Sequence, residues 1–360
     1  MSIQGRAFFY EKTKKIRRIH HPEDIVFITH QDIDEVAAQS LIDHGVKVMI
    51  NEKSSMSGRF YHEGVKRLLE ANVRVFDLCN TLSARVVHGK QVMIERHQLF
   101  LREERLLPIA IVEEYDRLRL AQLEKKAREV WLENFIKFGE NSIRHADKEL
   151  SLLRYCWERW PEGRAFLNEE VLIVSRGNHY KEDLSFAFQL LPLKNITIVA
   201  VDGAADTCAS LGYIPDYIVG DMDSVSNDLL QSGAKLIVHE NERGEAPGMK
   251  RLERLGLTAT KKRWAGVSED VAIIHSLKEG AKRLFIVGGQ RGMEEYLAKG
   301  REGMGSSLLV RMIAGNRIID LKGIHACFQE LLPISVTGRY PSLLTLLERS
   351  TASPVKEAQP

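Results

Sequence analysis

Two short apolar runs that end at aspartates constrain the fold of this chain more than any other feature. Ile196–Val201 and Tyr217–Val219 are rich in β-branched residues and lead into Asp202 and Asp221, with Asp223 two positions later. Runs this short, bounded by Gly, Pro and Asp, are typical of buried parallel strands. Because ligands of open α/β sheets bind beyond the carboxyl ends of the strands, we expect the three aspartates to lie at one edge of a sheet.

Two interpretations of these aspartates are open. Each one alone is accounted for by a turn or a helix N-cap. Together they favour a hard cation, because Mg²⁺ is usually held by one or two carboxylates plus the phosphates of a nucleotide. The set predicts a metal–phosphate site in the C-terminal half of the chain.

Several motifs of the C-terminal half resemble thiamin pyrophosphokinases, and a wider set, which extends through the first hundred residues, resembles the SteA-like cytokinetic-ring family. The kinase-like pieces are DGAAD at 202–206, GDMDS at 220–224 and SED at 268–270. The pieces shared with the SteA-like family include Arg176-Gly177, GDMDSVS at 220–226, APG at 246–248, SEDVA at 268–272, KGREGM at 299–304 and DLKG at 320–323.

The resemblance implies a site for Mg²⁺ and ATP. It implies metal ligation by Asp202, Asp221, Asp223 and Asp270, and catalytic roles for Asp221, Asp223 and Asp270. The residues that it implies for nucleotide binding are Arg176, Gly177, Asp202, Gly203, Gly220, Ser224, Ser268, Gly288 and Arg301.

Three local patterns bear on the same site. Ser268 is expected to cap a helix that runs to Lys278. The glycine-rich Gly300–Gly305 precedes an apolar run and is either a phosphate cradle or a flexible hinge. The insertion at 239–257 either closes over a nucleotide, with Arg243 or Arg251 meeting phosphate, or is a solvated surface loop.

The chain also departs from the kinases. Ala204 and Asp206 stand where that family has glycine and asparagine, the G-x-R-x-D-H segment is missing, and the residues after Asp320 predict no thiamin-binding β-sandwich. We therefore expect a Mg-ATP-binding scaffold or switch in cell division or cell separation, acting with a cell-division protein partner. The alternative is an active diphosphokinase that uses thiamin or another small alcohol, and a third hypothesis is a scaffold with a vestigial nucleotide site.

The composition of the chain indicates which classes of partner and which cellular compartment to expect. Lys and Arg total 51 against 49 acidic residues, so the charge gives no reason to expect nucleic acid or an anionic membrane as the main partner. The four cysteines form no C-x-x-C motif and fit a reducing cytoplasm.

The first residues lack the apolar core of a signal peptide. Pro333 and Pro341 interrupt the region where SteA-like proteins are expected to carry a membrane segment, so we expect a cytoplasmic protein that reaches the division septum through a partner.

Short apolar strands alternate with helical patterns in the first part of the chain, which predicts a small parallel α/β unit. The expected elements are strands at Asp24–Thr29, Val46–Ile50 and Val73–Phe76 and helices at Asp32–His44 and Glu63–Ala71. Asp32 is expected to cap its helix with Glu35 as the capping-box partner. This leaves His30 and Asp34 as poor evidence for zinc.

The loop at 51–60 contains hydroxyl side chains, Gly58 and Arg59 between a strand and a helix. It is either an anion site or an ordinary βα loop. The basic residues Lys12, Lys14, Lys15, Arg17 and Arg18 are interpreted as a solvated face, because few aromatic residues accompany them.

A hairpin with its turn at His-Gly-Lys, 88–90, is expected within Arg85–Leu107, followed by one long helix at about Val112–Trp160. The helix carries an apolar stripe that needs a cover, either the domains themselves or a second copy of the chain in a homodimer. The stripe comprises Tyr115, Leu118, Leu123, Ala127, Val130, Trp131, Phe135 and Phe138.

The whole chain is expected to be α/β, with two domains joined by the long helix. Further strands are predicted at Val171–Ser175, Leu236–Val238 and Leu284–Val287, and a helix at Lys181–Leu191. The expected divisions are an α/β domain with a hairpin at 1–110, a helical connector at 111–165, a parallel-sheet kinase-like domain at 166–322 and a tail at 323–360.

Overall fold

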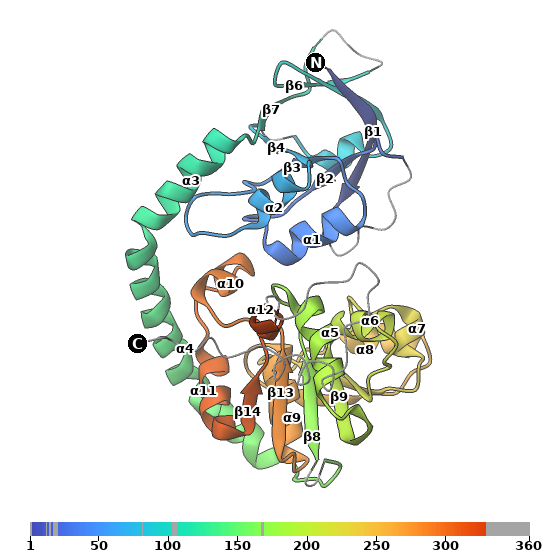
Figure 1. Cartoon of the computed structure of the whole chain (residues 1–360), viewed down its shortest axis with the longest axis vertical. Coiled ribbons are helices and arrows are strands. Elements are labelled where there is room, and N and C mark those ends of the chain that lie inside the picture. The colour runs from blue at the N-terminus through green and yellow to red at the C-terminus, as the bar shows by residue number, and fades with distance from the viewer. Residues whose placement is uncertain are drawn as a thin grey trace, which may run out of the picture. The chain divides into compact units, whose positions relative to one another are not determined.

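The computed structural model describes residues 2–328 apart from 12, 14–15, 17–20, 81, 103–106 and 167–168. The chain forms two compact units: unit 1 is Met1–Arg144 with Gln290–Met304, and unit 2 is His145–Gly289 with the residues from Gly305 onward. Both units are mixed α/β (Figure 1), which confirms the predicted fold class. The basic side chains between 12 and 18 and the region 331–350 lie outside the described residues.

Unit 1 is built on a closed barrel with the strand order β1-β2-β3-β4-β7-β6-β5. Strands β1 to β4 pair in parallel, whereas β5, β6 and β7 join the sheet antiparallel. The strands are β1 Ile3–Tyr10, β2 Ile25–Ile28, β3 Val48–Asn51, β4 Arg74–Leu78, β5 Gln91–Glu95, β6 Gln98–Leu101 and β7 Ala110–Glu114. The predicted parallel strands are present, and β1 and β7 are additional strands that close the barrel.

Alternation along the strands gives unit 1 two apolar layers. In β2, Ile25 and Phe27 point into the barrel, while Val26 and Ile28 pack outward. The outward layer is covered by α1 Glu35–Asp43 and α2 Gly64–Glu70.

Two local predictions for unit 1 are wrong. The hairpin turn lies at Arg96 and His97, both with positive φ (47° and 66°), because β5 and β6 meet there and not at 88–90. The expected single helix is two helices, α3 Arg117–Glu129 and α4 Trp131–Arg159, which follow strand β7.

The apolar stripe expected on that helix is only partly covered. Ala127 and Phe138 are buried, whereas Leu118, Trp131 and Phe135 are exposed. Exposed apolar side chains leave the homodimer as a prediction. None of the helices among the described residues has the length and apolar character needed to cross a membrane.

The segment from Gln290 to Met304 belongs to unit 1 although it follows the strands of unit 2. It contains α10 Met293–Ala298 and the KGREGM motif. Lys299 Nζ donates to Asp34 Oδ2 over 2.6 Å, and the backbone N–H of Met304 donates to Ser142 Oγ over 3.0 Å. A Cβ on Gly303 would lie 3.0 Å from the backbone nitrogen of Ser142, so this glycine permits close packing on α4.

We expect Lys299→Met to lower the free energy of unfolding of unit 1 by about 2 kcal/mol, because buried Asp34 loses a charge-assisted hydrogen bond. Burial opposes ionisation of Asp34, yet the charge and hydrogen bond of Lys299 lower its pKa. The stabilisation is therefore present above pH 3.8, the ordinary pKa of an aspartate, and is lost as pH falls through the lower folded-state pKa.

Urea denaturation at neutral pH measures this loss. Lys53→Met, at an exposed position of the same unit, is the matched control. Equal midpoints for the two variants would contradict the assigned role of Lys299.

Unit 2 is a doubly wound parallel sheet of seven strands in the order β12-β11-β10-β9-β8-β13-β14. The strands are β8 Glu170–Val174, β9 Ile196–Val201, β10 Tyr217–Gly220, β11 Lys235–Glu240, β12 Thr260–Arg263, β13 Arg283–Val287 and β14 Ile318–Asp320. From β8 the chain steps outward to β12 and then returns to β13 on the other side of β8. The switch point of the topology therefore lies between β8 and β13.

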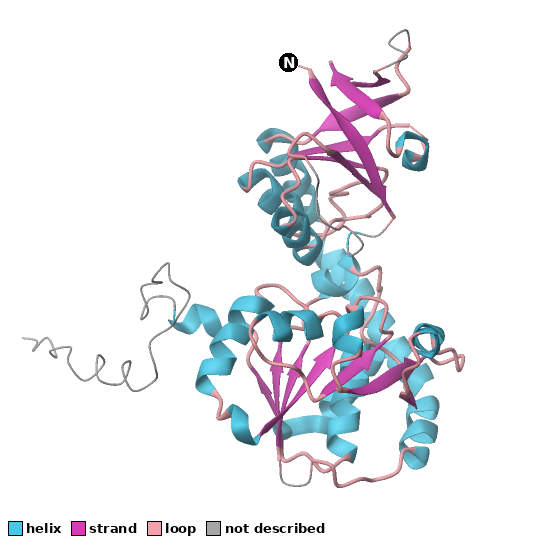
Figure 2. Cartoon of the chain, turned by 90° about the vertical axis from the view of Figure 1, so that its right-hand side faces the viewer, coloured by secondary structure: helices cyan, strands magenta, loops and turns pink. Residues whose placement is uncertain are grey.

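Helices cover both faces of this sheet (Figure 2). One face packs against α5 Tyr180–Leu190, α6 Ala204–Ser210, α7 Asn227–Leu230 and α8 Pro247–Arg254. The other face packs against the end of α4, α9 Ser268–Lys278 and α11 Gly305–Ala314, and the short α12 Ile324–Phe328 lies against α5. Successive residues of each strand alternate between the two faces, which is why the strands are continuously apolar.

Candidate functional site

The aspartates singled out in the sequence meet at the carboxyl ends of β9 and β10. Asp202 follows β9, and its Oδ1 accepts a hydrogen bond from the backbone N–H of Asp221 over 2.8 Å. Asp221 Oδ1 in turn accepts from the backbone N–H of Asp223 over 3.1 Å. The parallel pairing of β9 with β10 places these residues side by side, as the sequence predicts.

Burial, together with like charges, raises the pKa values of the carboxyl groups at this edge. Burial, the charge of Asp202 and the hydrogen bond and charge of Asp223 raise the pKa of Asp221 to about 7. Burial is also the main reason that the pKa of Asp202 is raised. Neighbouring carboxyl groups with raised pKa values are typical of functional sites.

Two glycines let neighbouring segments pack closely against Asp202 and Asp221 at this edge of the sheet. A Cβ on Gly220, whose φ is 149°, would lie 1.9 Å from Asp202 Oδ1. A Cβ on Gly248 would lie 2.6 Å from the carbonyl oxygen of Asp221. The glycines of the GDMDS and APG motifs therefore allow the two strand ends and α8 to pack around the carboxylates.

Arg176 reaches the carboxylate edge from the end of β8. Its Nη2 donates to Ser224 Oγ over 3.3 Å, and Ser224 Oγ also accepts from the backbone N–H of Gly203 over 3.1 Å. Gly177 packs directly on the next loop, where an added Cβ would lie 2.8 Å from the carbonyl oxygen of Gly289. One guanidinium thus lies beside the acidic groups at the switch-point side of the sheet.

Asp270 occupies a different setting, at the start of α9. Its Oδ2 accepts from the backbone N–H of Val267 (3.1 Å) and from the hydroxyls of Ser306 (3.2 Å) and Ser307 (2.8 Å). Burial raises the pKa of Asp270 to about 6. Val267 is the N-cap, so the expectation that Ser268 caps the helix is wrong; Ser268 is the first helical residue.

The two serines of α11 are the site residues that sequence reasoning missed. Their only local signal is the pair Ser306-Ser307 at the start of an apolar helix after a glycine-rich turn. Their hydroxyls complete the environment of Asp270.

Among the described residues, no three His, Cys, Asp or Glu side chains are grouped so that they could hold a metal ion by themselves. Ligation by Asp202, Asp221, Asp223 and Asp270 together stays a prediction. A smaller protein contribution still fits Mg²⁺, because this ion is commonly held by one or two carboxylates with phosphates and water.

Several predicted contacts have structural roles. Arg251 Nη2 donates to the carbonyl oxygen of Val225 over 2.8 Å and so ties α8 to the GDMDSVS loop. The DLKG turn is fixed by buried Asp183, which accepts from the backbone N–H of Gly323 over 2.8 Å. Gly288 has a φ of 72°, and a Cβ added to it would lie 1.9 Å from the carbonyl oxygen of Ser175.

Arg301 lies in unit 1, whereas the carboxylates at β9 and β10 lie in unit 2. Its side chain is exposed, and its backbone N–H donates to the carbonyl oxygen of Tyr296 over 2.9 Å. Phosphate binding by Arg301 stays a prediction.

In unit 1, the expected cap is assigned to the wrong aspartate. Asp34 is the N-cap of α1 and accepts from the backbone N–H of Ala37 over 2.6 Å, whereas Glu35 accepts from the backbone N–H of Glu63. Asp32 has a φ of 51° and instead accepts from the backbone N–H of Ser57 over 2.7 Å. Asp32 thus binds the backbone of the loop at 51–60 and does not cap α1.

Comparisons with known proteins give little support for a family. No family model and no curated protein matches the chain, so none supports membership of the SteA-like family. Among solved structures, the chain is similar to a 3-isopropylmalate dehydratase (leuD) from Methanocaldococcus jannaschii, with 14% identity, 37% of this chain and 99% of that chain covered, and a TM-score of 0.25. It is also similar to a thiamine pyrophosphokinase from Bacillus subtilis, with 16% identity, 42% of this chain and 60% of that chain covered, and a TM-score of 0.24. Thiamine pyrophosphokinase is therefore a weak structural neighbour of this chain.

Proposed function

We propose that unit 2 binds a Mg²⁺-complexed nucleotide at the carboxyl ends of β9 and β10. The observation that carries this proposal is the meeting of Asp202, Asp221 and Asp223 at the ends of two paired parallel strands, and the raised pKa of Asp221 supports it. A divalent cation between such carboxylates and a phosphate chain neutralises both sets of charge. Arg176, beside this edge, is the residue that we assign to phosphate.

The cation and the nucleotide would be bound by different parts of this site. Asp202 and Asp221 would hold the ion, with Asp223 on the exposed side of the turn. Asp270, with its pKa raised to about 6 by burial, would act as a further acid or cation ligand. Mg²⁺ would neutralise the charge of the phosphates. The glycine turns around Asp202 would let the phosphates approach the backbone N–H groups.

Calorimetric titration of the full chain with Mg-ATP tests the proposal. We expect measurable binding that strengthens between about pH 6 and about pH 8, because the proton held by Asp221 must leave before the ion binds. Asp221→Asn with Asp223→Asn should weaken binding by at least about tenfold, since both charges at the turn are lost.

The matched control is Asp228→Asn with Glu253→Gln, which removes two exposed charges from the same unit. It should leave the affinity unchanged. No heat of binding, and no rise in melting temperature with Mg-ATP, would exclude a nucleotide site in unit 2.

The cellular part of the proposal is a nucleotide-dependent scaffold in cell division or cell separation at the septum, and it rests on the sequence resemblance. A protein partner should then bind the Mg-ATP-loaded and empty chains with different affinities, because a ligand acts as a switch only through such a difference. Equal affinities would leave a plain scaffold. AMP formed only when thiamin or another small alcohol is added would instead identify a diphosphokinase.

A further inference from the structure

We propose that unit 1 carries a second ligand site, for a small organic monoanion made of one ring and one carboxylate. The site is a pocket of about 140 Å³ formed by the β3–α2 loop, the first half of α4 and the segment that follows α10. Its lining residues are Arg59, Phe60, Asn134, Lys137, Phe138, Asn141, Leu297 and Glu302, and all of them belong to unit 1.

The inner wall of the pocket is apolar and suits a single ring. Phe60 and Phe138 are buried, with 2% and 6% of their surface exposed, and Leu297 is half-buried beside them. An apolar cavity of about 150 Å³ is large enough for benzene. The available volume therefore limits the apolar part of a ligand to about one ring.

The rim of the pocket carries Arg59, Lys137 and Glu302. Arg59 is paired with buried Asp32, so Lys137 is the cation that favours a negatively charged group. Lys137 is exposed on α4 and makes no ion pair or hydrogen bond with any residue that the structure describes. An ammonium group that has no partner of its own beside an apolar wall is suited to a carboxylate.

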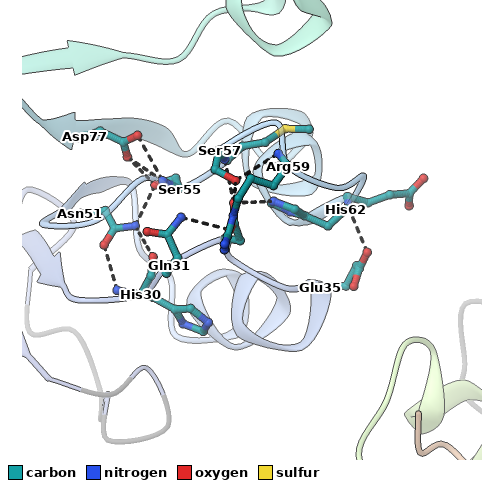
Figure 3. Close-up of polar contacts among 12 residues, drawn as sticks. His30, Gln31, Glu35, Asn51, Ser55, Ser57, Arg59, His62 and Asp77 are labelled. Atoms are coloured by element: carbon teal, nitrogen blue, oxygen red, sulfur yellow. Dashed lines mark hydrogen bonds and ion pairs between the residues drawn. The ribbon is translucent and has the colours of Figure 1, made fainter. Parts of the chain in front are cut away.

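Arg59 is held in position by a network beneath it. Its Nη2 donates to Asp32 Oδ2 over 3.1 Å, while its side chain remains 66% exposed. Figure 3 shows Arg59 beside Ser57, with His62 and Gln31 close to them. Asp32 also accepts from Gln31 Nε2 over 3.0 Å and lies 3.7 Å from His62 Nε2. The guanidinium is thus oriented by the protein and still accessible to a ligand.

Two amides tie the walls together. Asn134 Nδ2 donates to the backbone carbonyl of Arg59, and Asn141 Nδ2 donates to the backbone carbonyl of Glu302 over 3.2 Å. These bonds join α4 to the loop on one side and to the segment after α10 on the other. The pocket is therefore built before a ligand arrives, which reduces the entropy cost of binding.

Fluorine NMR titration of para-fluorobenzoate against the full chain tests this proposal. We expect saturable binding of the carboxylate, and at least about tenfold weaker binding of neutral para-fluorobenzamide and of ring-free trifluoroacetate. Lys137→Gln should weaken binding of para-fluorobenzoate by about tenfold, whereas Lys125→Gln on the exposed face of α3 should not change it.

Arg59→Gln is a second test: it should weaken binding of para-fluorobenzoate, and it should also lower the melting temperature, because buried Asp32 loses its ion pair with Arg59. Equal binding of the benzamide, or full binding by Lys137→Gln, would overturn the proposal. So would the absence of saturable binding by the wild-type chain.

Discussion

Replacing Asp77 by alanine is expected to destabilise unit 1 by about 3–5 kcal/mol, because several buried donors lose their common acceptor. Asp77 lies at the end of β4 and is 6% exposed. It accepts from Ser55 through the backbone N–H (3.1 Å) and the hydroxyl (2.6 Å), and from the hydroxyl of Tyr115 (2.7 Å). Arg119 adds an ion pair at 3.5 Å.

The contacts of Asp77 hold the loop that presents Arg59 (Figure 3). Burial raises the pKa of Asp77 despite these hydrogen bonds, so part of the stabilisation is offset by the cost of ionising it. Asp77→Asn keeps one acceptor and removes the charge, and we expect it to lose less stability than Asp77→Ala. Tyr115→Phe removes one donor and should cost about 1 kcal/mol.

Hydrogen exchange of the amides in β3 and β4 measures the stability of unit 1 separately from that of unit 2. Glu113→Ala is the control, because its exposed carboxylate contacts the same arginine at 3.0 Å without being buried. Similar losses for Asp77→Ala and Glu113→Ala would show that the buried network contributes nothing beyond a surface charge.

The parts of the fold that sequence predicts are those with strong local patterns. Strand β9 begins and ends where it is expected, at Ile196–Val201, because a buried parallel strand is apolar on both faces and stops at a polar turn. The meeting of Asp202 with Asp221 follows from the same argument, since parallel strands end at one edge of the sheet.

The parts that were missed depend on contacts distant in sequence. Strand β1 pairs with β2 and with β5, so Ile3 lies opposite Ile94, and no local pattern records that pairing. The segment 290–304 joins unit 1 through Lys299 and Asp34, which are separated by 265 positions. Sequence separation of this kind leaves no periodicity to detect.

The sequence predicts the meeting of Asp202, Asp221 and Asp223, and the role of Asp270 in the same site stays a prediction. The resemblance groups Asp270 with Asp202, Asp221 and Asp223, whereas Asp270 accepts hydrogen bonds from Val267 and from the serines of α11. A buried carboxylate can be satisfied by a helix N-terminus and hydroxyl groups as well as by a cation. The sequence SED is compatible with both settings.

Acid is expected to destabilise unit 2 through His275, in the middle of α9. The imidazole is 5% exposed and is surrounded by the rings of Trp160, Phe166 and Tyr217 at 6.3, 5.6 and 5.6 Å. Neither ring nitrogen has a hydrogen-bond partner among the described residues. Burial, with the charges of Lys262 and Lys235, lowers its pKa to about 4.

The unfolded chain therefore takes up a proton on His275 before the folded chain does. The stability that neutral His275 permits is fully present above about pH 6.5, and it is lost as pH falls through the folded-state pKa of about 4. The shift corresponds to a loss of about 3 kcal/mol in the free energy of unfolding across that interval. Urea denaturation at a series of pH values measures it.

His275→Phe should remove this pH-dependent loss, because a phenyl ring fits the same aromatic surroundings and cannot take up a proton. It should also stabilise unit 2 at neutral pH, since two buried nitrogens without hydrogen-bond partners disappear. His145→Phe, at an exposed position of α4, is the matched control and should keep the wild-type pH profile. A His275→Phe profile that still falls by the same amount between about pH 6.5 and about pH 4 would assign the acid sensitivity to other groups.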